Sequence, residues 1–159
     1  MLPNFVIAGT AKSGTNTIKE FLEGHPECGF CSLGEPDFFA KDELFARGLS
    51  YYKSLFAGGA GKKILAEKSW RYSVPEAYPK AQDRLFAAIP DVKILYIVRN
   101  PLERAATLWR ELRDNGGERI GPDFEKAVFE SPLIFDTSKY YTQYMRLKCR
   151  ARPENIKLA

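Results

Sequence analysis

The chain has 159 residues, of which 45% are hydrophobic and 13% aromatic, so it is long and apolar enough for one globular domain and is not a disordered polypeptide. Its 24 basic and 20 acidic side chains give a formal net charge of +4, which suits an anionic ligand but lacks the strong basic stripe of nucleic-acid-binding proteins. No apolar run approaches the roughly 20 residues that cross a bilayer, and the first apolar run begins almost directly after Met1. We therefore expect no nucleic-acid partner, no membrane segment, no signal peptide and a cytoplasmic location.

The N-terminal segment predicts an anion-binding junction. An apolar, β-favouring run at 4–9 leads into Thr10-Ala11-Lys12-Ser13-Gly14-Thr15, and a segment with helical hydrophobic spacing follows. A strand, a tight loop and a helix N-terminus in this order direct backbone N–H groups at one spot, which suits a phosphate. The loop is not a Walker A loop, because Lys12 precedes Gly14 and the Gly-Lys-Ser/Thr ending is missing. An ordinary strand–turn–helix connection is the alternative that the loop alone leaves open.

Strands and helices alternate along the rest of the chain. The patterns predict a weak strand near 28–31, a helical stretch at 48–56, a strand at 63–67, a helix at 75–89, a strand at 93–98, helices at 123–129 and 137–148, and the start of a strand at 153–159. This alternation is typical of an α/β fold with a parallel sheet, in which ligands bind at the carboxyl ends of the strands. We therefore expect the loop at 9–15 and the segments 67–72 and 99–107 to meet at one edge.

A longer helix is predicted after the strand at 93–98. Asn100-Pro101 has the form of an N-cap followed by proline at the first helical position, and Asn115-Gly116-Gly117 ends the pattern. The residues that repeat at apolar helical spacing are Leu102, Ala105, Ala106, Trp109 and Leu112. The residues that fall mostly on the other, polar face are Glu103, Arg104, Arg110, Glu111 and Arg113.

The cysteines do not predict a disulfide framework, because there are only three. Cys28 and Cys31 have redox spacing, but His25 is the only histidine, so a metal site lacks ligands. We expect buried thiols and no metal.

Four segments together resemble the PAPS-dependent sulfotransferases, and most closely the carbohydrate branch that modifies heparan sulfate. They are Ala11-Lys12-Ser13-Gly14-Thr15, Gly34-Glu35-Pro36-Asp37-Phe38-Phe39, Glu67-Lys68-Ser69-Trp70-Arg71-Tyr72, and residues 97–107. The resemblance runs from about Pro3 to Tyr144. It implies one domain over 1–159, with a P-loop-like parallel sheet flanked by helices on both faces. It also implies that the fold lacks its C-terminal part, a later strand and a basic loop that in the family close over the 3′-phosphate and adenine.

The resemblance implies PAPS as sulfonate donor and PAP as product, held at two anion sites. The residues implied for the 5′-phosphosulfate are Lys12, Ser13, Gly14, Thr15, Asn16 and Thr17, with Lys12 reaching the bridging oxygen. Arg99 and Thr107 are implied for the 3′-phosphate, where the family usually has serine in place of the threonine. A strand-end arginine paired with a carboxylate is the alternative for Arg99.

Glu35 is the implied general base for a hydroxyl of a carbohydrate or similar acceptor, and Lys68 the residue that contacts the sulfonate or orients Glu35. Pro36 favours an extended backbone at Glu35, as in a loop that leaves a strand. A solvated loop carboxylate and a surface lysine are the alternatives for these two residues. Trp70, Arg71 and Tyr72 are expected to line the acceptor groove. The chemistry requires no metal, and the sequence does not predict the oligomeric state.

Two other functions stay open at this level: a truncated, non-catalytic module that binds PAP or PAPS, and a P-loop kinase of a small molecule. Retention of Lys12, Glu35 and Lys68 counts against the first, and the missing Gly-Lys-Ser/Thr ending against the second. If the sequence is part of a longer protein, a Golgi lumen also stays open as its location.

Overall fold

A sheet of parallel strands organises the fold, and the computed structural model describes residues 1–115 and 120–159. The strand order is β2-β3-β1-β4-β5, and every described pairing is parallel. The strands are β1 (Phe5–Ile7), β2 (Cys28–Phe30), β3 (Ile64–Lys68), β4 (Lys93–Tyr96) and β5 (Ile156–Leu158). The predicted parallel sheet is confirmed, and the segment at 153–159 does supply a strand, which pairs with β4.

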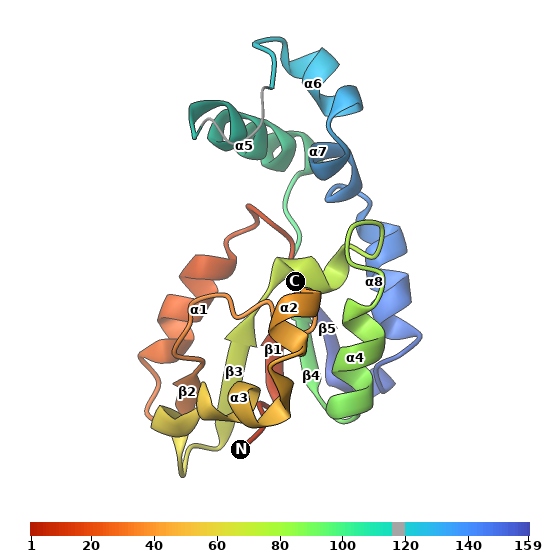
Figure 1. The fold of residues 1–159 in the computed structure, drawn as a ribbon. Coiled ribbons are helices and arrows are strands. Elements are labelled where there is room, and N and C mark those ends of the chain that lie inside the picture. The colour runs from red at the N-terminus through yellow and green to blue at the C-terminus, as the bar shows by residue number, and fades with distance from the viewer. Residues whose placement is uncertain (116–119) are drawn as a thin grey trace.

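Helices connect the strands and cover the sheet. They are α1 (Thr15–Glu23), α2 (Asp42–Phe45), α3 (Gly48–Ser54), α4 (Ala81–Ala88), α5 (Pro101–Asp114), α6 (Phe124–Glu130), α7 (Pro132–Asp136) and α8 (Tyr140–Lys148), with 3-10 turns η1 (Ala57–Gly59), η2 (Trp70–Ser73) and η3 (Pro153–Asn155). The chain crosses the sheet in one direction from β1 to β2, and in the other direction from β2 to β3 and from β3 to β4. Because such crossovers are right-handed, α1 lies on one face of the sheet and α2, α3 and α4 lie on the other. Figure 1 shows α2, α3 and α4 in front of the sheet. Within the described residues, no helix is both long and apolar enough to cross a bilayer.

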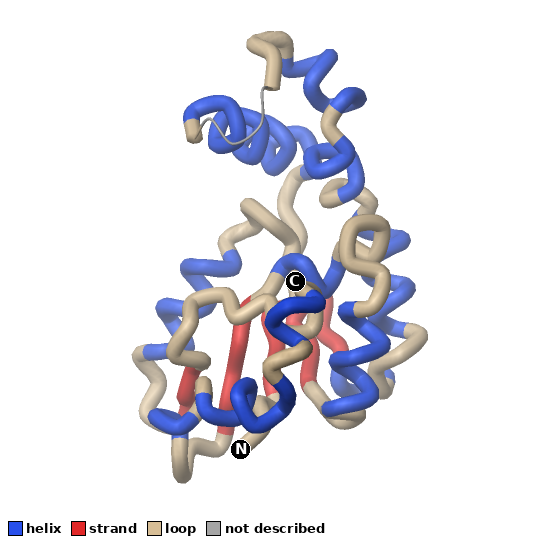
Figure 2. The backbone as a smooth tube through the Cα atoms, in the orientation of Figure 1, coloured by secondary structure: helices blue, strands red, loops and turns tan. Residues whose placement is uncertain are grey.

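The described residues form two hydrophobic cores, of which the main one joins the helices to the sheet. The main core joins Val6 of β1 and Tyr96 of β4 to Tyr52 of α3 and Leu85 of α4. A smaller core joins α5, α6 and α7, and Ile134 of α7 is fully buried in it. Figures 1 and 2 show these three helices standing beyond the carboxyl ends of the strands, across from the β1–α1 loop.

One expected helix begins later in the structure than predicted. The helix predicted from residue 75 begins only at Ala81, because Pro79 lacks an N–H and restricts Tyr78 to non-helical backbone. The short helices α2 and α7 were not predicted. The Asn100 cap is confirmed, since its Oδ1 accepts from the N–H groups of Leu102 and Glu103. α5 ends at Asp114, and the glycines at 116 and 117 expected to end it lie outside the described residues.

The polar face predicted for α5 is wrong at Arg104, which is fully buried. Its Nη1 donates to Thr137 Oγ1 (2.8 Å), and its Nη2 donates to the carbonyl of Ile134 (2.8 Å) and to Ser138 Oγ (2.5 Å). The expected apolar residue Leu102 is instead 71% exposed. Helical spacing defines which residues share a face, but the packing of α7 and the turn after it decides which face is covered.

Candidate active site

The loop between β1 and α1 has the backbone of an anion cradle. Gly14, the N-cap of α1, has φ 82°, and no heavy atom would lie within 4 Å of a Cβ there, so backbone conformation rather than space favours glycine. The first N–H groups of α1 have no acceptor within the helix, and the helix dipole adds positive potential at this end. Backbone donors and dipole therefore favour a bound anion at this loop.

A cavity of about 560 Å³ opens beside this loop at the carboxyl edge of the sheet. The sequence-predicted residues that line it are Lys12, Gly14, Thr15, Asn16, Glu35, Lys68 and Thr107, joined by Trp70 and Arg71. Segments far apart in the sequence thus meet at one edge, as the predicted sheet required.

Four predicted residues lie outside this lining. Ser13 is buried, and its Oγ lies 2.5 Å from Thr10 Oγ1, whereas Thr17 is exposed on α1. Tyr72 is fully buried in the main core and does not line the groove expected for it. Arg99 is exposed near the start of α5.

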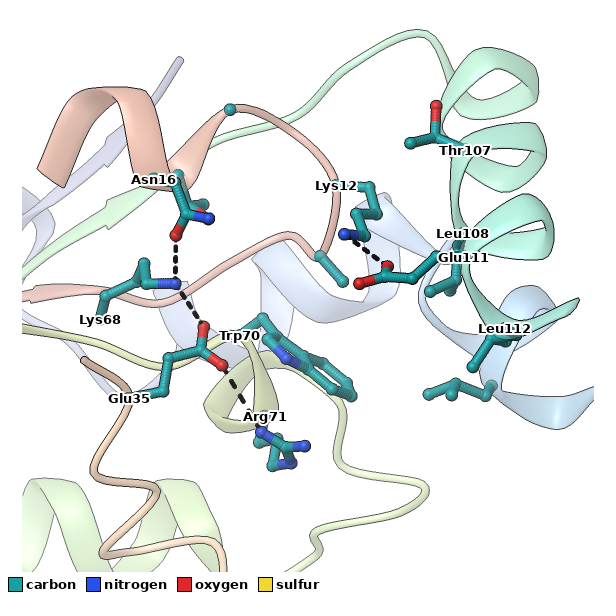
Figure 3. A pocket seen from close by; sticks show the side chains of 14 residues that line it. Lys12, Asn16, Glu35, Lys68, Trp70, Arg71, Thr107, Leu108, Glu111 and Leu112 are labelled. Atoms are coloured by element: carbon teal, nitrogen blue, oxygen red, sulfur yellow. Dashed lines mark hydrogen bonds and ion pairs between the residues drawn. The ribbon is translucent and has the colours of Figure 1, made fainter. Parts of the chain in front are cut away.

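Lys68, the last residue of β3, connects the loop to the expected base. Its Nζ donates to Asn16 Oδ1 (2.6 Å) and to Glu35 Oε1 (2.7 Å), as Figure 3 shows. The Lys68 side chain is only 9% exposed, against 27% for Glu35. One buried ammonium group therefore holds the carboxylate and the helix start on two sides of the same cavity.

A second cation lies on the other side of Glu35. Arg71 Nη1 is 3.7 Å from Glu35 Oε2 and 2.7 Å from Asp37 Oδ2, while Arg71 Nε donates to the Tyr78 hydroxyl (3.1 Å). Burial acts to lower the pKa of Arg71, but Asp37 and Tyr78 outweigh it and the pKa is raised, so the guanidinium stays charged. Asp37 is itself buried and accepts from Ser69 Oγ (2.7 Å). The sequence offered no signal for this pairing, because it joins two separate motifs.

Lys12 is paired with a residue that sequence reasoning left without a role. Its Nζ forms an ion pair with Glu111 Oε2 of α5, across the cavity from Lys68 (Figure 3). Glu111 lies one helical turn after Thr107, so both face the cavity. The polar spacing of α5 alone did not identify which acidic residue faces the loop.

The two residues expected to hold a second phosphate do meet. Arg99 Nη1 lies 3.4 Å from Thr107 Oγ1, and Arg99 Nη2 lies 3.1 Å from Glu103 Oε2. The ion pair with a carboxylate is the alternative that the sequence left open for Arg99. Both partners are exposed, so an incoming anion can displace the carboxylate at little cost.

The described residues hold no group of three or more histidine, cysteine, aspartate and glutamate side chains that could bind a metal. Cys28 and Cys31 are free and buried. Burial raises the pKa of the Cys31 thiol to about 11, which keeps it protonated and unreactive.

The parallel sheet thus places the β1–α1 loop and a lysine-held carboxylate together at its strand ends, where ligands bind in α/β folds. Residues 2–153 match the family model described as a sulfotransferase domain, and the chain belongs to the sulfotransferase family. The crystal structure of a sulfotransferase from Alicyclobacillus acidocaldarius superposes on 99% of this chain and 72% of that one, with a TM-score of 0.81 and 28% identity. A sulfotransferase domain from the curacin biosynthetic pathway shares the fold, with a TM-score of 0.68 at 16% identity.

Curated relatives place the chain near the carbohydrate branch that the motifs indicated. It is 39% identical over 104 residues to human heparan sulfate glucosamine 3-O-sulfotransferase 6. This alignment covers 65% of this chain and 28% of that protein. It is 32% identical over 142 residues to mouse heparan sulfate glucosamine 3-O-sulfotransferase 5, covering 87% of this chain and 40% of that protein. The chain thus spans between 28% and 40% of the length of these two relatives.

Proposed function

We propose that this chain transfers a sulfonate group from PAPS to a hydroxyl of a carbohydrate acceptor, with Glu35 as general base. The observation that carries the proposal is the double contact of Lys68, which binds Glu35 and Asn16 from one ammonium group. Base and anion loop are thereby held at a single cavity, as transfer between two bound substrates requires. Membership of the sulfotransferase family supports a sulfonate donor, and the heparan sulfate relatives support a carbohydrate acceptor.

The chain's residues fit such a donor at two places. Lys12, Thr15 and Asn16 line the cavity at the N-terminus of α1, where charge and N–H groups suit the 5′-phosphosulfate. Arg99 and Thr107 supply a planar guanidinium and a hydroxyl for the 3′-phosphate. When bound, PAPS supplies an activated sulfonate, because its bond from sulfur to the phosphate oxygen breaks during transfer.

Each polar group then has a separate task. Glu35 Oε1 is bonded to Lys68, whereas Oε2 has only the longer 3.7 Å contact with Arg71 Nη1, so Oε2 is the oxygen that accepts the proton of the attacking hydroxyl. Lys68 fixes the orientation of the carboxylate. Lys12 offsets the negative charge that develops on the departing phosphate oxygen.

Calorimetric titration with PAP, beside ATP with Mg²⁺ and AMP, tests the donor assignment. We expect PAP to bind and ATP and AMP to bind much more weakly; equal or tighter binding of ATP with Mg²⁺ would favour a kinase and contradict the proposal. A transfer assay with labelled PAPS and a panel of carbohydrates then tests the reaction. PAP binding without transfer to any of them would support a non-catalytic module instead.

A further inference from the structure

One guanidinium nitrogen of Arg71 stands between two carboxylates. Arg71 Nη1 donates to Asp37 Oδ2 (2.7 Å) and lies 3.7 Å from Glu35 Oε2, which is beyond hydrogen-bond distance. Figure 3 shows Glu35 between Lys68 and Arg71, and Lys68 is bonded to the other carboxylate oxygen, Oε1. Glu35 therefore keeps Oε2 free of a close cation because Asp37 takes the nearest donor of Arg71.

Asp37 is a fixed acceptor for this donor. Its side chain is only 7% exposed, and its second oxygen, Oδ1, accepts from Ser69 Oγ (2.7 Å). Its backbone has φ 48°, which aspartate tolerates better than most residues, and its carbonyl accepts from the N–H groups of Ala40 (3.0 Å) and Lys41 (3.1 Å). The turn and the serine together hold the carboxylate in one place.

The other end of Arg71 is held by aromatic residues. The guanidinium carbon lies 4.5 Å from the centre of the Trp70 ring, and Nε donates to the Tyr78 hydroxyl (3.1 Å). These contacts keep Arg71 beside Glu35 without using Nη1. If Asp37 carried no charge, a shift of about 1 Å would bring Nη1 into hydrogen-bond distance of Glu35 Oε2.

We propose that Asp37 is a positioning residue for the base: it draws Arg71 Nη1 away from Glu35 Oε2 and leaves that oxygen free to accept a proton. Asp37 is absent from the described residues that line the cavity, so it acts on Glu35 through Arg71. With Lys68 on Oε1 and Arg71 on Oε2, both oxygens would bond to cations, and the carboxylate would be a weaker base. The inference rests on the proposed function, in which Glu35 takes the proton of the acceptor hydroxyl.

Asp37→Asn tests the inference with little change of shape. Asparagine can still accept from Ser69 and tolerates a positive φ, but it lacks the negative charge. We expect kcat for sulfonate transfer to fall roughly tenfold to a hundredfold, the size of one charge-assisted hydrogen bond, with PAP affinity unchanged. Asp42→Asn is the matched control, because it removes an aspartate that pairs with Arg84 and is 66% exposed; its kcat should equal that of the wild type.

Arg71→Gln shows whether the loss of activity passes through Arg71. In the Arg71→Gln background, Asp37→Asn should change kcat by less than about twofold, because no guanidinium is left to close on Glu35. An equal loss in both backgrounds would overturn the inference, and so would lost PAP binding in Asp37→Asn, since Asp37 would then act on the fold of the site. An Arg71→Gln chain without any transfer would also overturn it, because Arg71 itself would then be required.

Crystal structures of the wild type and of Asp37→Asn test the same contact without an activity assay. We expect the distance from Arg71 Nη1 to Glu35 Oε2 to shorten to about 3 Å in the variant. A distance that stays at the 3.7 Å of the wild type would overturn the inference. If the wild type transfers no sulfonate to any acceptor, the proposed function fails, and these two structures then decide whether Asp37 holds Arg71 away from Glu35.

Discussion

The buried carboxyl of Glu67 makes stability depend on pH in a direction opposite to that of most acidic residues. Strand alternation points Lys68 towards the cavity and its neighbour Glu67 into the main core, where Glu67 is fully buried. Neither carboxyl oxygen has a hydrogen-bond partner within the described residues. Burial raises the pKa of Glu67 to about 8 and outweighs the nearby hydroxyls of Tyr52 and Tyr72, which act to lower it without reaching full hydrogen-bond geometry. The folded chain therefore keeps this carboxyl protonated near neutral pH.

The size of the effect follows from proton linkage. The unfolded chain releases the Glu67 proton near its ordinary pKa of 4.5, whereas the folded chain holds it up to about pH 8. Between these values the folded state binds one more proton, so this group lowers the free energy of unfolding by about 1.4 kcal/mol per pH unit as pH rises. From about pH 5 to about pH 8 the loss is roughly 4 kcal/mol.

Glu67→Gln should remove this dependence, because glutamine is uncharged in both states and has nearly the same shape. We expect its stability relative to wild type to rise by roughly 4 kcal/mol between about pH 5 and pH 8. Urea unfolding, followed by tryptophan fluorescence at several pH values, measures the free energy of unfolding of both chains. All other titratable groups are the same in the two chains, so their contributions cancel in the difference. Glu125→Gln changes an exposed carboxylate and serves as the control. Its free energy of unfolding should change with pH in the same way as that of the wild type. If the difference in free energy of unfolding between wild type and Glu67→Gln stays constant across this pH range, the pKa of Glu67 is not raised.

Three further outcomes test other parts of the structure. Glu35→Gln should abolish sulfonate transfer and leave PAP affinity nearly unchanged, because the residue touches the acceptor proton; calorimetry showing lost PAP binding would contradict the role. Arg99→Ala should weaken PAP binding roughly tenfold to a hundredfold by removing charge-assisted hydrogen bonds, and an unchanged affinity would remove Arg99 from the phosphate site. Arg104→Ala should destabilise the chain by about 2 to 4 kcal/mol in urea unfolding, because it removes the hydrogen bonds that a buried guanidinium donates to Thr137, to Ser138 and to the Ile134 carbonyl. An effect below about 0.5 kcal/mol, typical of surface substitutions, would show that those bonds contribute little.

The sequence predicted correctly those strands and helix ends that depend only on residues next to one another in the chain. The apolar run at 93–98 and the Asn100-Pro101 cap follow from β-branched side chains and from the first N–H groups of a helix, so β4 and the start of α5 could be predicted. The order of the four motifs led to the sulfotransferase family, which the comparison with the family model confirms. The roles of Glu35, Lys68 and Arg99 stay predictions, although the structure brings Glu35 and Lys68 into contact.

Other features depended on how separate elements pack, and sequence spacing carries no information about that. Arg104 and Glu111 lie in the same helix and both belonged to its expected polar face, yet one is buried against the residues after α6 and the other faces the cavity. The pairs of Arg71 with Asp37 and of Lys12 with Glu111 join segments that meet only when the sheet forms. The sequence by itself determined which chemical groups the site has; the tertiary structure decided which of them neutralise one another, because ion pairing depends on distance in space.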